Sequence, residues 1–200
     1  MPFLLNQQNG PTRTRSTRLA GDYYQAIVLG PWQETGVVTT PVAGEYLLGR
    51  SEVRAGLADL TNLYIRVSTG ATAGTGFYVF YEITADGLPG VLVHSTAAFT
   101  LSGGSGNKSV AAGNIATAVP KGEYYCGLYT PAGVTGTPGV LGSRPTVNYV
   151  TDIINQARMG LQLLEAVPGS APSANLSAVT FSGANNFAVV AEGIATLFGL

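Results

Sequence analysis

Side chains that could do chemistry are few in this chain of 200 residues, and they stand far apart. His94 is the single histidine and Cys126 the single cysteine, which excludes an intrachain disulfide and a metal site built from several histidines or cysteines. His94 stands in VLVHS, typical of a strand end, and no serine lies in the G-x-S-x-G turn of a Ser-His-Asp hydrolase. Cys126 stands in EYYCGLY, which is typical of a small buried side chain.

The eleven carboxylates are scattered singly along the sequence. A pair such as Glu82 and Glu123, on neighbouring expected strands, is the arrangement from which a glycoside hydrolase could be built. The stretch SGGSGNKS at 102–109 has the wrong Gly-to-Lys spacing for a phosphate-binding loop, and Asp86 lacks the surrounding oxygen ligands of a calcium site. We therefore expect no catalytic residue, no metal, no cofactor and no enzymatic activity.

Composition favours many short strands joined by turns. The chain has 27 glycines and 11 prolines, and 10% of its residues are charged, against about 25% in typical domains. With 46% hydrophobic residues, part of the surface is expected to be covered by another chain. A net charge of −1 gives no general attraction to nucleic acid or an acidic membrane, and neither end has the pattern of a secretory signal or a membrane span.

Three segments rich in β-branched and aromatic residues lie between turn clusters at hairpin spacing, at 62–68, 76–84 and 91–95. The intervening turn contains the pairs Asp86-Gly87 and Pro89-Gly90, which favour tight bends. These strands must run antiparallel, since no helix-length segment separates them. Further strands are expected at 23–29, 97–101, 107–112, 122–130, 176–182 and 187–198.

Four other segments are less regular. Residues 30–45 indicate an irregular connection or an edge strand anchored by Trp32, and 45–60 a strand followed by a helical turn. Residues 131–145, rich in glycine and proline, predict a loop. Residues 151–165 begin like a helix, but their second half is equally compatible with a strand.

Strand 76–84 has an unusual pattern of alternation. One face is apolar throughout, and the other begins with Tyr78 and Phe80, whereas a half-exposed strand alternates apolar with polar residues. We therefore expect both faces to be covered, by another layer or by another subunit. The residues that we assign to a subunit interface are Tyr78, Phe80, Phe187, Leu197 and Phe198.

The N-terminal stretch is basic, with Arg13, Arg15 and Arg18 before the first acidic residue. It is typical of a solvated tail, and the functional alternative is a docking arm that becomes ordered on a partner. The expected organisation is an arm at 1–22, a β-sandwich at 23–168, and a C-terminal linker with closing strands at 169–200, packed on the same domain or on a neighbouring subunit.

Two motifs about thirty residues apart carry a resemblance to a known family. The first is the hairpin YEITADGLPGVL, with Asp86, Gly87, Pro89, Gly90 and Leu92, and the second is PKGEYY, with Pro120, Gly122, Tyr124 and Tyr125. Together they resemble the jelly-roll-like β-sandwich domain of many tailed-bacteriophage structural proteins. The resemblance covers about a third of the chain strongly, and residues 131–200 have no counterpart in it.

The resemblance implies an all-β fold, an antiparallel jelly-roll-like sandwich, in a virion protein of the decoration, head-fibre or tail-associated type. The implied partners are further copies of the chain, with a trimer favoured, and other virion proteins such as capsid or tail proteins. The implied location is the virion, with no specific nucleic acid and no membrane as partner. The alternative function is a carbohydrate or host-receptor-binding module, which would use exposed tyrosines or Trp32 to bind host glycans.

Overall fold

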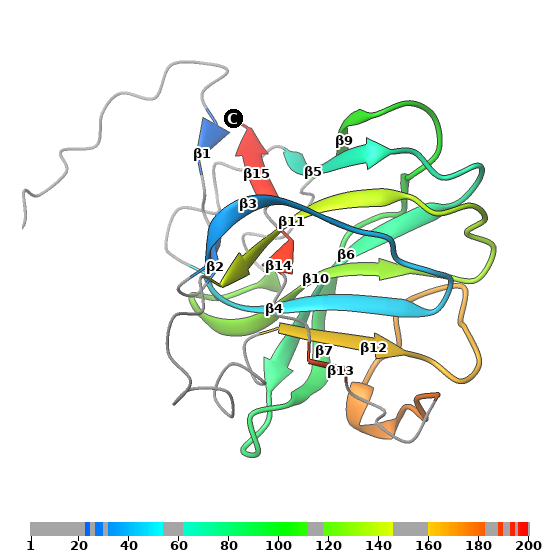
Figure 1. Ribbon diagram of the computed structural model, residues 1–200. Helices are drawn as coiled ribbons and strands as arrows, with labels where there is room; N and C mark the ends of the chain where they lie inside the picture. Colours follow the sequence, from blue (N-terminus) through cyan, green and yellow to red (C-terminus); the bar gives the residue numbers. More distant parts are fainter. Residues whose placement is uncertain are drawn as a thin grey trace, which may run out of the picture.

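The chain forms two antiparallel β-sheets packed face to face (Figure 1), which confirms the predicted all-β sandwich. The computed structural model describes residues 23–24, 27–29, 32–53, 62–111, 118–145, 160–182, 188–189, 193–194 and 196–199. Within these ranges the helical residues are those of one 3-10 turn, η3 (Leu176–Ala178), and Ala118. No helix in the described part of the chain has the length and apolar character to cross a membrane.

The eight-stranded sheet contains most of the central strands. Its order is β13 (Ala188–Val189), β12 (Gly160–Leu164), β4 (Glu45–Val53), β10 (Gly122–Thr130), β6 (Thr75–Ile83) and β7 (Pro89–Ser95), with β2 (Ile27–Leu29) pairing with β4 and β8 (Phe99–Thr100) with β6. Each of these pairs is antiparallel.

The seven-stranded sheet is built from strands far apart in the sequence. Its order is β1 (Tyr23–Tyr24), β15 (Thr196–Gly199), β5 (Asn62–Thr69), β11 (Gly139–Pro145) and β14 (Gly193–Ile194), with β3 (Trp32–Thr39) pairing with β11 and β9 (Gly106–Ala111) with β5. Strands near both ends of the chain therefore contribute to the sandwich.

Two sequence predictions were wrong. The predicted loop at 131–145 contains strand β11, because pairing with β3, β5 and β14 outweighs the weak strand preference of its glycines. Bulges between Gly142 and Ser143 and between Arg144 and Pro145 accommodate that composition. The predicted strand at 176–182 begins instead as η3, since the Asn175 side chain accepts a hydrogen bond from Ser177 N and caps the turn.

The core between the sheets contains one face of β6. Tyr78 and Phe80 are fully buried there, with ring centroids 5.2 Å apart, and pack with residues of β5 such as Leu63 and Ile65. Both rings were expected at a subunit interface. They fill the space between the two sheets of a single chain, so they have no surface to offer to a neighbour.

The outer face of the eight-stranded sheet forms a second apolar core. It is covered by residues 165–182, which we call the strap and which lie beside the end of β12 (Figure 1, orange). Strap residues Leu176 and Phe181 pack with the buried aromatic side chains of the sheet. Among these, Tyr46 stacks on Tyr129 with ring centroids 4.2 Å apart, and it meets Tyr81 edge to face at 6.0 Å. Both faces of the central strands are thus covered within one chain.

Glu165, at the start of the strap, holds the strap on the sheet by hydrogen bonds. Its carboxylate accepts from the hydroxyls of Tyr46, Tyr129 and Ser173, each at 2.9 Å, and from Gly169 N at 3.0 Å. The side chain is buried, so these four donors replace the water that the carboxylate loses. Burial raises the pKa of Tyr46 to about 12 and raises the pKa of Tyr129, which keeps both hydroxyls protonated as donors.

Glycine is required where two strands come unusually close. A Cβ on Gly127 of β10 would lie 1.8 Å from the carbonyl oxygen of Leu47 on β4. Because backbone atoms occupy that position, no side-chain movement could relieve the clash. Gly127 therefore sets the spacing of β4 and β10 at the centre of the sheet.

We expect Glu165→Ala to destabilise the protein by about 3–5 kcal/mol, because it leaves several buried donors without their acceptor. The matched control is Glu123→Ala. It removes a carboxylate from an exposed ion pair with Arg50 and is expected to cost at most about 1 kcal/mol. Urea unfolding monitored by tyrosine fluorescence measures both, and equal small effects would contradict the role given to Glu165.

We expect Gly127→Ala to destabilise the protein by more than about 3 kcal/mol or to prevent folding, because the sheet backbone must separate. Gly104→Ala is the control, since a Cβ there would meet nothing within 4 Å. Thermal unfolding followed by circular dichroism compares the two. Similar melting temperatures would show that the two strands tolerate a wider separation.

Candidate functional site

The first motif of the sequence forms the predicted hairpin between β6 and β7. Thr84 N donates to Leu88 O and Gly87 N to Thr84 O, both at 2.8 Å, and Leu88 N donates to the Thr84 hydroxyl at 3.1 Å. Gly87 has a φ of +77°, which side-chain-bearing residues rarely adopt. The exposed Asp86 and the glycine after it therefore form the bend, and Pro89 and Gly90 begin β7.

The second motif has a local structural cause. The Tyr124 hydroxyl donates to Pro120 O at 2.9 Å, so the ring folds back along the chain toward the start of β10. Gly122 lies under this ring, since a Cβ on it would be 3.4 Å from the Tyr124 hydroxyl, an ordinary van der Waals contact. The motif P-x-G-x-Y thus supplies both the acceptor, Pro120 O, and the tyrosine that donates to it.

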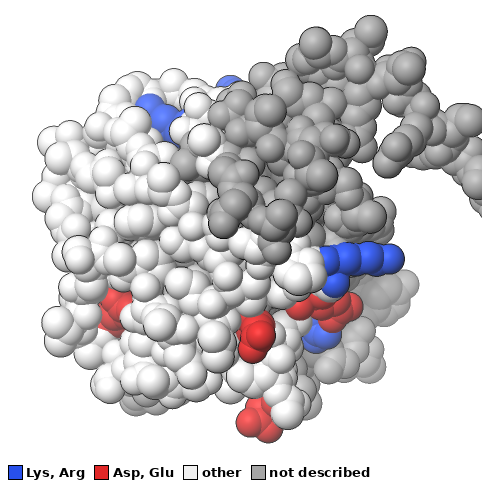
Figure 2. Space-filling view, turned by 180° about the vertical axis from the view of Figure 1, so that it is seen from behind, with Lys and Arg blue, Asp and Glu red and all other residues white. Residues whose placement is uncertain are grey.

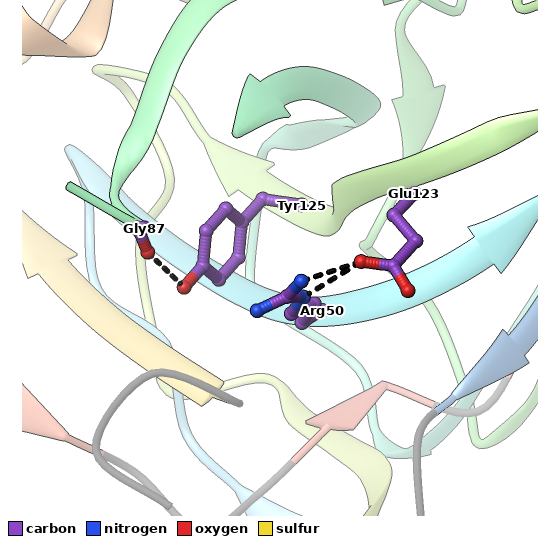
Figure 3. Close-up of polar contacts among 4 residues, drawn as sticks. All are labelled: Arg50, Gly87, Glu123 and Tyr125. Atoms are coloured by element: carbon purple, nitrogen blue, oxygen red, sulfur yellow. Dashed lines mark hydrogen bonds and ion pairs between the residues drawn. The ribbon is translucent and has the colours of Figure 1, made fainter. Parts of the chain in front are cut away.

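The two motifs meet at one place on the outer face of the eight-stranded sheet. The buried Tyr125 of β10 extends to the hairpin, and its hydroxyl donates to Gly87 O at 2.8 Å (Figure 3). Opposite Tyr125, Arg50 of β4 donates through Nε and Nη2 to one carboxylate oxygen of Glu123. We call these residues, Arg50, Gly87, Glu123 and Tyr125, the hairpin junction. It is the place where the structure brings sequence-predicted residues together.

The chemistry available at the hairpin junction is that of a binding surface. The Arg50 and Glu123 side chains are 41% and 58% exposed, so their ion pair is accessible to a partner and contributes little to stability. Glu82 does not join Glu123 there. Because Tyr81 pairs with Tyr125, alternation along β6 and β10 places the two glutamates on opposite faces of the sheet, which removes the glycosidase pair considered from sequence.

The remaining candidate groups for chemistry lie apart. His94 on β7 is half-buried with its ring centroid 6.2 Å from that of Phe80, and burial lowers the pKa of His94. Cys126 is buried in the core between the sheets. Across the ranges that the structure describes, no three His, Cys, Asp or Glu side chains come together as a metal site would require.

Tyrosine platforms for sugars are not found among the tyrosines whose side chains the structure describes. Five of these six are fully buried: Tyr46, Tyr78, Tyr81, Tyr125 and Tyr129. The sixth, Tyr124, is partly buried and engages Pro120 through its hydroxyl. Their aromatic surface is used for packing within the chain.

Several predicted site residues lie outside the described residues, namely Arg13, Arg15, Arg18 and Phe187. Leu197 and Phe198 lie on β15, where their backbones pair with Tyr64 and Leu63 of β5. Two important residues were missed from sequence, Arg50 and Glu165. The available sequence signal for Glu165 was its position, because it is a single acidic residue directly after the leucine-rich run LQLL.

The surface around these elements is largely uncharged. The face seen in Figure 2 shows a few acidic and basic side chains, some of them in contact with one another, and the rest of its described surface is uncharged. Among the described residues, the large apolar side chains that remain exposed are Val42, Leu88, Val91 and Val167. Leu88 directly follows Gly87 of the hairpin junction, and Val167 is 84% exposed. Comparison with protein-family models, curated proteins and solved structures gave no match.

We expect Tyr125→Phe to loosen the hairpin junction, because it removes the hydrogen bond to Gly87 O at a cost of about 1 kcal/mol. Hydrogen exchange of the amides of Gly87 and Leu88 should become faster while the rest of β10 keeps its protection. Tyr124→Phe is the control, since its hydroxyl contacts Pro120 and not the hairpin. Identical exchange of the hairpin amides in both variants would contradict the proposed connection.

Proposed function

We propose that this chain is a non-enzymatic structural component of a bacteriophage virion, a capsid decoration, head-fibre or tail-associated subunit. The observation that carries the proposal is the hydrogen bond from Tyr125 to Gly87 O. It joins the hairpin and the P-x-G-x-Y motif, the two features in which the sequence resembles phage structural proteins. The jelly-roll-like strand order is part of this proposal.

In this function the protein acts by binding other proteins. A surface with few charges can be buried against a neighbour without stranding ionised groups, which are costly to bury unpaired. The partners are further copies of the chain, with a trimer favoured, and capsid or tail proteins of the particle. Tyr78 and Phe80 are buried inside the chain and cannot contact a neighbour. Among the described residues, the large apolar side chains exposed to a neighbour are Val42, Leu88, Val91 and Val167.

The carbohydrate-binding alternative has less support. It was based on tyrosines and Trp32, and five of the six tyrosines with described side chains are fully buried. We therefore keep the virion subunit as the single proposal, and glycan-array binding by the purified chain would revive the alternative.

The direct test is mass spectrometry of density-purified phage particles produced from the genome that encodes the chain. We expect the chain in a fixed ratio to the major capsid protein, and mass photometry of the purified chain should show an oligomer. A chain found only in the soluble lysate, and monomeric at micromolar concentration, would refute the proposal.

Deletion of residues 1–22 tests the docking arm with its three arginines. We expect about tenfold weaker incorporation into particles, equivalent to a loss of roughly 1.4 kcal/mol of contact free energy. The circular dichroism spectrum and melting temperature of the remaining chain should stay unchanged. Full incorporation of the truncated chain would place docking elsewhere on the protein.

A further inference from the structure

Three segments meet at the corner where β4 begins, and backbone hydrogen bonds join them. Gly44 N donates to Thr130 O at the end of β10 at 2.6 Å, and Glu165 N donates to Gly44 O at 3.0 Å. The Thr130 hydroxyl donates to the carbonyl oxygens of both Val42 and Glu45. The turn at 42–45 therefore connects the end of β10 with the start of the strap.

Glu45 lies at the centre of this corner and is 2% exposed. Its Oε2 accepts a hydrogen bond from Val42 N at 2.7 Å, which closes the turn on itself. No lysine or arginine of the described segments pairs with it, since the ion pair found there is Arg50 with Glu123. A carboxylate in this position would thus be buried with one backbone donor, whereas Glu165 has four donors.

The surroundings of Glu45 that the structure describes contain no compensating charge. Strand register places Thr130 of β10 and Leu164 of β12 beside it. The nearest titratable side chains of these segments, Tyr129 and Glu165, interact on the other face of the sheet. Among the described apolar side chains of the core between the sheets, the titratable ones are Tyr78, Tyr124 and Cys126, and none of them can carry a positive charge. The half-buried His94 lies beside Phe80 of this core, but it stands on β7, three strands away from β4 and level with Gly49 rather than with Glu45.

We propose that Glu45 is a proton-controlled latch: the turn at 42–45 is closed while its carboxyl group is protonated, and it opens when the group ionises. Opening hydrates the carboxylate, because the turn moves from the corner into water. It also breaks the bonds from Gly44 to Thr130 and Glu165. Pro168 of the strap loses its support as well, since it packs against Gly44, where an added Cβ would lie 2.7 Å from Pro168 Cγ.

The sign of the pH dependence follows from burial. Burial raises the pKa of Glu45 from 4.5 to about 7 in the folded protein, with the hydrogen bond from Val42 N acting in the opposite direction. The folded state therefore binds the proton more tightly than the unfolded chain. The stability that Glu45 contributes is fully present below about pH 4.5 and is lost as the pH rises through about 7.

Two measurements on the full chain test the latch. Carbon-13 NMR titration of side-chain carboxyl groups should give Glu45 a midpoint near 7. Hydrogen exchange should show the amides of Val42 and Gly44 losing protection by up to about tenfold per pH unit between about pH 4.5 and 7, and levelling off above that range, after correction for intrinsic exchange.

The variant Glu45→Gln keeps the size and the acceptor of the side chain but cannot ionise. We expect its turn amides to stay protected up to pH 9, while the control Glu82→Gln behaves as the parent chain. A Glu45 midpoint among the exposed carboxyls, or the same pH course of turn protection in parent and Glu45→Gln, would overturn the latch. If Glu45→Gln failed to fold, the titration and the exchange of the parent chain would decide by themselves.

Discussion

The structure depends on one constraint, which is that β4, β6 and β10 carry large apolar side chains on both faces. A sheet of this kind is stable in water only when two layers cover it. The seven-stranded sheet covers the face with Tyr78 and Phe80, and the strap covers the face with Tyr46 and Tyr129. The strap needs more than apolar contact because it is short and irregular, and the four hydrogen bonds of Glu165 fix its position.

Much of the fold could be predicted from local sequence pattern. The central strands are rich in β-branched and aromatic residues, and the segments between them contain residues that favour turns. The hairpin at Asp86-Gly87 is an example, since the positive φ at Gly87 is what that pair favours. Strand β11 could not be predicted, since GVLGSRP has weak strand preference and is held by partners distant in sequence. The sequence of β6 also predicted that its second face is covered. It could not show whether the covering segment belongs to the same chain or to another subunit.

The candidate site shows the same division. The motif residues were identified from spacing, yet their contact through Tyr125 and Gly87 O depends on the register of β10 with β4 and β6. That register also separates Glu82 from Glu123, which a linear sequence cannot show. The assignment of Tyr78 and Phe80 to an interface failed for a related reason, because burial inside a chain and burial between chains require the same side chains.

The central claim is that a single chain covers both faces of its eight-stranded sheet. Isotope-filtered NMR of a refolded mixture of labelled and unlabelled chains tests it most directly, through nuclear Overhauser effects between the Leu176 methyl groups and the rings of Tyr46 and Tyr81. The account predicts that these effects arise within labelled chains and are absent between labelled and unlabelled ones. Effects that appear only between chains would contradict it, because the strap would then cover a neighbouring subunit.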